Sequence, residues 1–143
     1  MRETAYASLP DVAAHLTFMP SSFTATSMPR ATQVHNFLLD TAQDLDSALS
    51  AQGYQTPVAT GATQAFGQAN AWNSIGAAMY SVYAMPQGGG DRHGQFLERR
   101  WTAILQGIRD GDLTLPDAGK DTTHGLPRYG GNATARFASG DLP

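Results

Sequence analysis

The chain has no cysteine and a single lysine, Lys120, among its 143 residues. The absence of cysteine excludes disulfide bonds, thiolate catalysis and cysteine-ligated zinc sites. Charged residues make up 15% of the chain, whereas soluble domains ordinarily carry about 25%. Two interpretations are open: partner molecules cover part of the surface, or small polar residues stand there in place of charges.

Basic clusters and long apolar runs are also missing. The formal net charge is −3, which argues against sequence-independent binding to DNA phosphates. No apolar run approaches the ~18–20 residues that span a bilayer, and the start of the chain, "MRETAYASLPDV", lacks the apolar core of a signal peptide. We therefore expect a soluble protein made in the cytoplasm, without a membrane partner.

Apolar residues recur at three- and four-residue steps, the pattern of amphipathic helices. The pattern predicts three long helices, over residues 28–52, 61–85 and 91–111. A short helix precedes them, from the cap at Ser8 to about Leu16. The predicted fold class is all-α: a small four-helix bundle with one short and three long helices.

Capping residues set the expected ends of these helices. Ser8 and Ser27 are predicted N-caps, and Asp11 stands where its carboxylate can accept the backbone N–H of Ser8. Gly53 and Gly111 are predicted to end the second and fourth helices, since glycine adopts the left-handed conformation found at such ends.

The third predicted helix is unusually rich in small residues. These permit close approach of a neighbouring element. Glycines at 61, 67 and 76 weaken the helix by up to ~1 kcal/mol each relative to alanine, so tertiary packing must hold it.

Residues 112–143 contain five glycines and three prolines and too little apolar surface to offset their ordering entropy. The predicted organisation is a helical domain over residues 1–111 and an extended C-terminal tail over residues 112–143, with no second domain. The tail nevertheless carries two aromatic residues, each close to an arginine. It either stays disordered or orders on a partner.

Residues that could carry chemistry are scarce. The four histidines form no pair at helical spacing, and "GGGDRHG" lacks the ending of a phosphate-binding loop. Asp40 and Asp44 share a helix face opposite the apolar stripe, where solvent is expected. We predict no catalytic residues, no metal site and no cofactor, so the chain is not expected to be an enzyme.

Three short motifs stand in a distinctive order within about residues 6–116. They are "LPDVAAHL", a long helix ending in the pattern "L..A...L...GY..PV", and the closing residues Leu105, Ile108, Gly111, Asp112, Leu113 and Leu115. Together with the order of the helices, they resemble the head–tail connector family of tailed bacteriophages, the adaptor or head-completion proteins. The glycine-rich "QGGG" loop and the long tail depart from the family pattern.

The resemblance implies a structural function in the virion. Such proteins form a ring, commonly of twelve copies, that joins the capsid portal protein to a stopper or tail-completion protein. The ring extends the channel through which genomic DNA passes without specific binding. The family's C-terminal segment orders against the portal, which assigns portal binding here to Arg128, Tyr129, Arg136 and Phe137.

In a ring, the opposite net charges of two predicted helices could stabilise the contact between neighbouring protomers. Residues 28–52 carry a net charge of −2, and residues 91–109 carry a net charge of +2. We expect Asp40 and Asp44 of one protomer to meet Arg99 and Arg100 of the next. The alternative is that both faces are solvated, where exposed ion pairs contribute less than ~1 kcal/mol.

Other functions remain open at this point. A small helical DNA-binding or regulatory protein would need a basic recognition helix, for which the fourth helix is the candidate. No residue set can be named for a small helical enzyme. A tail-completion protein of the same neck is a further alternative.

Overall fold

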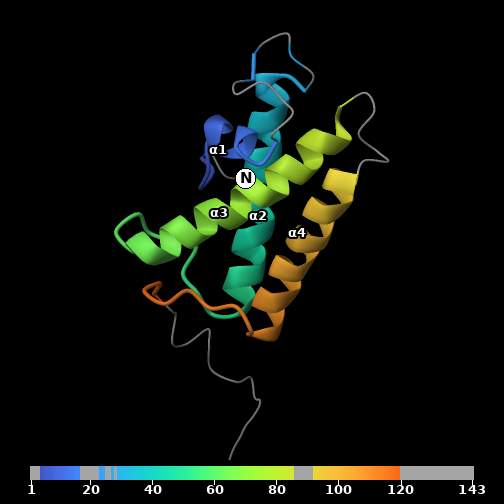
Figure 1. Cartoon of the computed structure of the whole chain (residues 1–143). Coiled ribbons are helices and arrows are strands. Elements are labelled where there is room, and N and C mark those ends of the chain that lie inside the picture. Colours follow the sequence, from blue (N-terminus) through green and yellow to red (C-terminus); the bar gives the residue numbers. More distant parts are fainter. Residues whose placement is uncertain (1–3, 17–22, 25–26, 28, 86–91, 120–143) are drawn as a thin grey trace, which may run out of the picture.

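The computed structural model describes residues 4–16, 23–24, 27, 29–85 and 92–119. Within these ranges the chain forms four helices and no strand: α1 (Leu9–Ala13), α2 (Ala31–Ala51), α3 (Thr63–Tyr83) and α4 (Arg92–Asp110). The predicted all-α fold with one short and three long helices is confirmed. In Figure 1, α3 crosses α2, and it contacts α1, α2 and α4.

The start of α1 follows the sequence prediction. The Asp11 carboxylate accepts the backbone N–H of Ser8 at 2.8 Å and its hydroxyl at 2.9 Å. The helix ends at Ala13, earlier than predicted. Val12 and Leu16 are both buried all the same, so the turn after α1 still packs on the body.

The predicted N-cap of α2 is wrong. The Ser27 hydroxyl accepts the backbone N–H of Thr24 at 3.0 Å and lies 2.7 Å from the carbonyl oxygen of Pro29. These bonds commit Ser27 to a turn ahead of the helix. The helix begins at Ala31, and Gln33 accepts the Arg30 N–H at 2.9 Å.

The apolar stripe of α2 and the predicted ends of two helices are confirmed. All residues of this stripe are buried except Phe37, which is partly buried. The stripe residues are Val34, Phe37, Leu38, Thr41, Ala42, Leu45, Ala48 and Leu49. Gly53 and Gly111 have positive φ angles of 89° and 81°, the left-handed conformation that glycine adopts without steric penalty.

The middle of α3 is buried on every side, and not along one stripe as the sequence suggests. Residues 72–79 are all buried, because three other helices contact α3. A helix enclosed in this way needs small side chains where its neighbours come close. Tyr80 follows the three- and four-residue spacing of apolar residues in this helix, yet it is 39% exposed.

Gly76 marks the closest approach to α3. A Cβ atom there would lie 2.9 Å from ring carbons of Trp101 and 3.0 Å from Cγ2 of Thr41. The close neighbours are thus side chains of α4 and α2. Gly67, on the same helix, has nothing within 4 Å of a Cβ position.

Asn73 is the polar centre of the fold. Its side chain is fully buried, and Oδ1 accepts the backbone N–H groups of Tyr6 and Ala7, both at 3.0 Å. Nδ2 donates to the Leu38 carbonyl oxygen at 3.0 Å and to the Thr41 hydroxyl at 2.7 Å. One amide therefore joins α3 to α2 and to the segment before α1.

Tyr6 continues this buried network. Its hydroxyl donates to the Asp46 carboxylate at 2.5 Å and accepts the Val58 N–H at 2.8 Å. Asn70 donates to the Tyr6 carbonyl oxygen at 2.9 Å. Asp46, one of the three aspartates behind the net charge of −2 of residues 28–52, is 9% exposed and does not lie on the exposed face of α2 with Asp40 and Asp44.

Residues 112–119 pack against the helices. Leu115 is buried, and its N–H donates to the Tyr54 hydroxyl at 3.1 Å. Asp117 accepts the N–H groups of Gln64 at 3.1 Å and Ala65 at 2.7 Å. Its carboxylate thus caps the first turn of α3 from a distant part of the sequence.

The predicted tail boundary at residue 112 lies inside this packed segment. Gln55 N–H donates to the Gly119 carbonyl oxygen at 2.9 Å, so the chain is attached to the body as far as residue 119. Hydrogen bonds from a neighbouring loop and helix start compensate for the low apolar content of these residues. Residues 120–143 lie outside the described part of the chain.

Matched glycine substitutions in α3 should act in opposite directions. Gly67→Ala should raise the free energy of unfolding by about 0.5–1 kcal/mol, because alanine favours the helix and meets open space. Gly76→Ala should lower it by about 1–3 kcal/mol through the clash with Trp101. Urea unfolding of both variants checks this; stabilisation by both would contradict the close packing at Gly76.

Removing the Asn73 amide should be among the most damaging single changes. Asn73→Ala leaves four partners without their hydrogen bonds, three of them buried and the Ala7 N–H partly buried, so the free energy of unfolding should fall by about 3 kcal/mol or more. The control is Gln68→Ala, at an exposed amide on the same helix, which should change it by less than about 0.5 kcal/mol. Equal effects in urea unfolding would show that the network contributes little.

Candidate assembly surfaces

The two aspartates predicted to contact a neighbouring protomer are exposed on α2. Asp40 and Asp44 lie three and seven residues after Phe37, on the same side of the helix. Desolvation raises the pKa of Asp44, the negative charge of Asp40 adds to this, and Arg109 of α4 opposes it. Within one chain, the basic group that acts on Asp44 is therefore Arg109.

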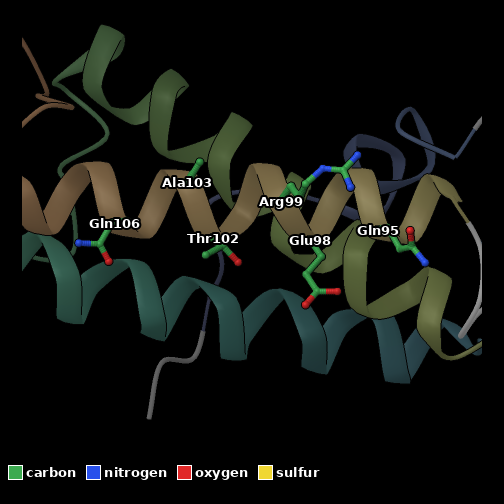
Figure 2. A pocket seen from close by; sticks show the side chains of 6 residues that line it. All are labelled: Gln95, Glu98, Arg99, Thr102, Ala103 and Gln106. Carbon is green, nitrogen blue, oxygen red and sulfur yellow. The ribbon is translucent and has the colours of Figure 1, made fainter.

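The two predicted arginine partners are exposed on α4. The Arg100 guanidinium lies 5.7 Å from the centroid of the Phe96 ring, within the range of a cation–π contact. Figure 2 shows Arg99 pointing away from α2, whereas Glu98 points toward it. That Arg99 and Arg100 meet Asp40 and Asp44 of another copy stays a prediction.

A shallow groove of about 670 Å³ runs along α4 (Figure 2). Except for Ala103, its lining is polar or charged. The lining residues are Gln95, Glu98, Arg99, Thr102, Ala103 and Gln106. Such a surface offers hydrogen bonds to a protein partner and no enclosed pocket for a small ligand.

Phe96 is the residue on α4 that the helix pattern did not single out. It is 47% exposed and stacks with His93 at a centroid distance of 6.4 Å. It lies off the apolar stripe that contains Leu97 and Trp101. An aromatic residue on the polar face of an amphipathic helix is the sequence signal that could have identified it.

A second groove, of about 520 Å³, separates α3 from the second half of α4. Its floor is apolar and includes Trp72, Ile75 and Ile104, while Arg100 and Asp112 stand among its lining residues. Trp72 and Ile75 are less than a tenth exposed. The groove is consequently shallow over well-packed side chains.

Two histidines, distant in sequence, lie together where the turn after α1 meets the start of α4. His93 Nε2 donates to the His15 carbonyl oxygen at 2.6 Å. His15 Nε2 lies 2.9 Å from the Ser74 hydroxyl, which donates to the Ala71 carbonyl oxygen at 2.8 Å. His15 is therefore the donor to Ser74.

These hydrogen bonds join the turn after α1 to α3 and to α4. They do not present a nucleophile to solvent. Ser74 is only 2% exposed, so its hydroxyl cannot reach a substrate in solution. The described residues also contain no group of three or more histidine, aspartate or glutamate side chains placed to hold a metal ion. No helix in that part of the chain has the length and apolar character required to cross a membrane.

The four predicted portal-binding residues, Arg128, Tyr129, Arg136 and Phe137, lie outside the described residues. The described part of the chain before them ends at Gly119, whose carbonyl oxygen accepts the Gln55 N–H.

Comparison of the chain with protein-family models, with curated proteins and with solved structures found no match.

His15 should make stability pH-dependent near neutrality. Burial lowers its pKa from the ordinary 6.5, as do the positive charges of Arg100 and His93, while Asp11 opposes the shift. As pH falls below about 7, the unfolded chain therefore takes up a proton before the folded chain does. The free energy of unfolding should fall until the pH drops below the lowered pKa.

Unfolding experiments between pH 7.5 and about 5 check this. His15→Gln should flatten the decrease, because glutamine keeps a donor near Ser74 but does not titrate. His35→Gln, at an exposed site, should leave the decrease unchanged. An identical pH profile for His15→Gln and the unmodified chain would contradict the assignment.

Proposed function

We propose that this protein is a structural subunit of a tailed-phage neck. In this function, copies form a ring, of twelve by family likeness, between the portal protein and a stopper or tail-completion protein. The resemblance of residues 6–116 to head–tail connectors and the all-α body of four helices support the proposal. Its place of action would be the virion, after assembly in the host cytoplasm.

The attachment of the C-terminal segment is the structural observation that carries this proposal. Asp117 caps the first turn of α3, and Gly119 accepts a hydrogen bond from Gln55, just after α2. The described chain therefore ends beside the loop that joins α2 to α3. A chain anchored at one end can order on a partner there without disturbing the helices.

Charge on the described surface is compatible with a channel that DNA traverses. On α2, Asp40 and Asp44 are exposed and no lysine or arginine is present, while the four arginines of α4 stand against Glu98 and Asp110. Neither helix presents a continuous basic stripe. A ring built from such subunits would hold DNA weakly and let it slide.

Portal binding should depend on residues 120–143. The full chain should join purified portal rings from the same genome, whereas a chain ending at Gly119 should not. The truncated chain should unfold at nearly the same temperature as the full chain, because residues 112–119 and their hydrogen bonds remain. Co-sedimentation with the portal and imaging of the complexes measure this.

A point variant separates anchoring side chains from mere tail length. Tyr129→Ala with Phe137→Ala should weaken portal binding by at least about tenfold, because buried aromatics dominate interface energies. Asn132→Ala with Thr134→Ala is the matched control in the same segment and should bind normally. Undiminished binding by the aromatic variant and the truncated chain would overturn the tail's role in the proposal.

The main alternative function, a DNA-binding regulator, predicts a different result when binding to duplex DNA and to the portal is measured. It rests on the four arginines of α4 and requires duplex binding that weakens steeply as salt rises. Strong salt-dependent DNA binding together with no affinity for the portal would favour the regulator and overturn the neck assignment.

A further inference from the structure

Among the described residues, two large hydrophobic side chains are exposed, Tyr80 at 39% and Phe96 at 47%. Single exposed apolar residues are common on protein surfaces and need no explanation. These two differ because each belongs to a group that contains a second ring and charged side chains of one sign.

The first group, here called the acidic patch, consists of Phe37, Tyr80, Asp40 and Asp44. The Phe37 and Tyr80 rings stack at a centroid distance of 5.7 Å and an interplanar angle of 29°. The two exposed aspartates continue along α2 from Phe37 at helical spacing. Within the chain, Arg109 acts on Asp44.

The second group, here called the basic patch, consists of His93, Phe96, Arg99 and Arg100. Phe96 is flanked by His93, stacked at 6.4 Å, and by the Arg100 guanidinium at 5.7 Å. Arg99 lies three residues after Phe96 and is exposed. The neighbouring Glu98 does not neutralise this group directly, because it points toward α2 and accepts the hydroxyl of Tyr83 (Figure 2).

The two patches are formed by different helices, and Arg99 of the basic patch points away from α2 (Figure 2). The acidic patch spans α2 and α3, since the Phe37–Tyr80 stack joins these helices. The basic patch borders the end of α1, since His93 donates to the His15 carbonyl oxygen. One copy can therefore present each patch to a different neighbour.

We infer that the acidic patch of one copy binds the basic patch of a second copy. Exposed aromatic rings would form the centre of the contact, and aspartate–arginine pairs its rim, the usual composition of a specific interface. Two copies of the same patch would bring like charges together, which disfavours a symmetric dimer through either patch. A contact between two unlike patches repeats head to tail and closes into a ring when its rotation permits.

This inference rests on the proposed function for its biological use, because it names the subunit contact of the proposed ring. Its test needs only this chain. Phe96→Ser removes the anchor of the basic patch and Tyr80→Ser removes that of the acidic patch. Circular dichroism of each variant confirms that it is folded.

The decisive experiment mixes the two variants. The unmodified chain should self-associate in sedimentation velocity over a series up to millimolar concentration, and each variant alone should associate at least about tenfold more weakly. The equimolar mixture should form a 1:1 complex and nothing larger, because each pair then has one intact contact. Self-association of Tyr80→Ser with no gain on mixing would instead indicate a symmetric contact through Phe96 and overturn the proposal.

Charge exchange provides a second arm that keeps both rings in place. Asp40→Arg with Asp44→Arg and, separately, Arg99→Glu with Arg100→Glu should each abolish self-association. Their mixture should restore assemblies larger than dimers, since every contact then has opposite charges. Asp110→Arg, an exposed reversal at the far end of α4, is the control and should assemble normally.

The two proposals can fail separately. Self-association through these patches without portal binding would leave the contact standing and overturn the neck function. Portal binding by a chain that stays monomeric in every mixture would leave the neck function standing and overturn the contact between the two patches.

Discussion

The structure depends on one requirement: a carboxamide enclosed between helices must have every polar atom bonded. Asn73 meets it with four partners, two from the segment before α1 and two from α2. A buried hydrogen-bonding group without a partner costs far more free energy than a satisfied one contributes. This amide therefore holds α3 against α2 at Leu38 and Thr41. The small residues around it let three other helices reach α3, and the surfaces that remain exposed on α2 and α4 are the outer sides of this arrangement.

Local signals predicted much of the fold. The stripe on α2, the carboxylate at the start of α1 and the glycine ends after α2 and α4 depend on residues a few positions apart, so helical spacing revealed them. The features it missed depend on partners far along the chain. From its spacing Asp46 resembles a surface aspartate, but in the fold it accepts the hydroxyl of Tyr6. Ser27 resembles an N-cap, but its hydroxyl accepts the N–H of Thr24. Asp117 shows no helix signal of its own, yet it caps α3.

The candidate surfaces were predicted in part for the same reason. Spacing placed Asp40, Asp44, Arg99 and Arg100 on exposed helix faces, and they are exposed. It could not show that Asp40 and Asp44 stand next to an exposed ring of another helix, because that depends on how α3 meets α2. The stack of Tyr80 on Phe37 joins two helices, and such a pair is invisible to the periodicity of either one.

The cap that Asp117 supplies has a mechanical consequence. The Asp117 carboxylate accepts the N–H groups at the first turn of α3. Two residues later in the same segment, the Gly119 carbonyl oxygen accepts the N–H of Gln55. Tension applied at Gly119 would be transmitted to these bonds. Once they part, the N–H groups at the start of α3 lose their acceptor, so the central helix would begin to unwind from the end nearest the pull. A single acidic side chain thus couples tension at the C-terminal end to the integrity of the interior.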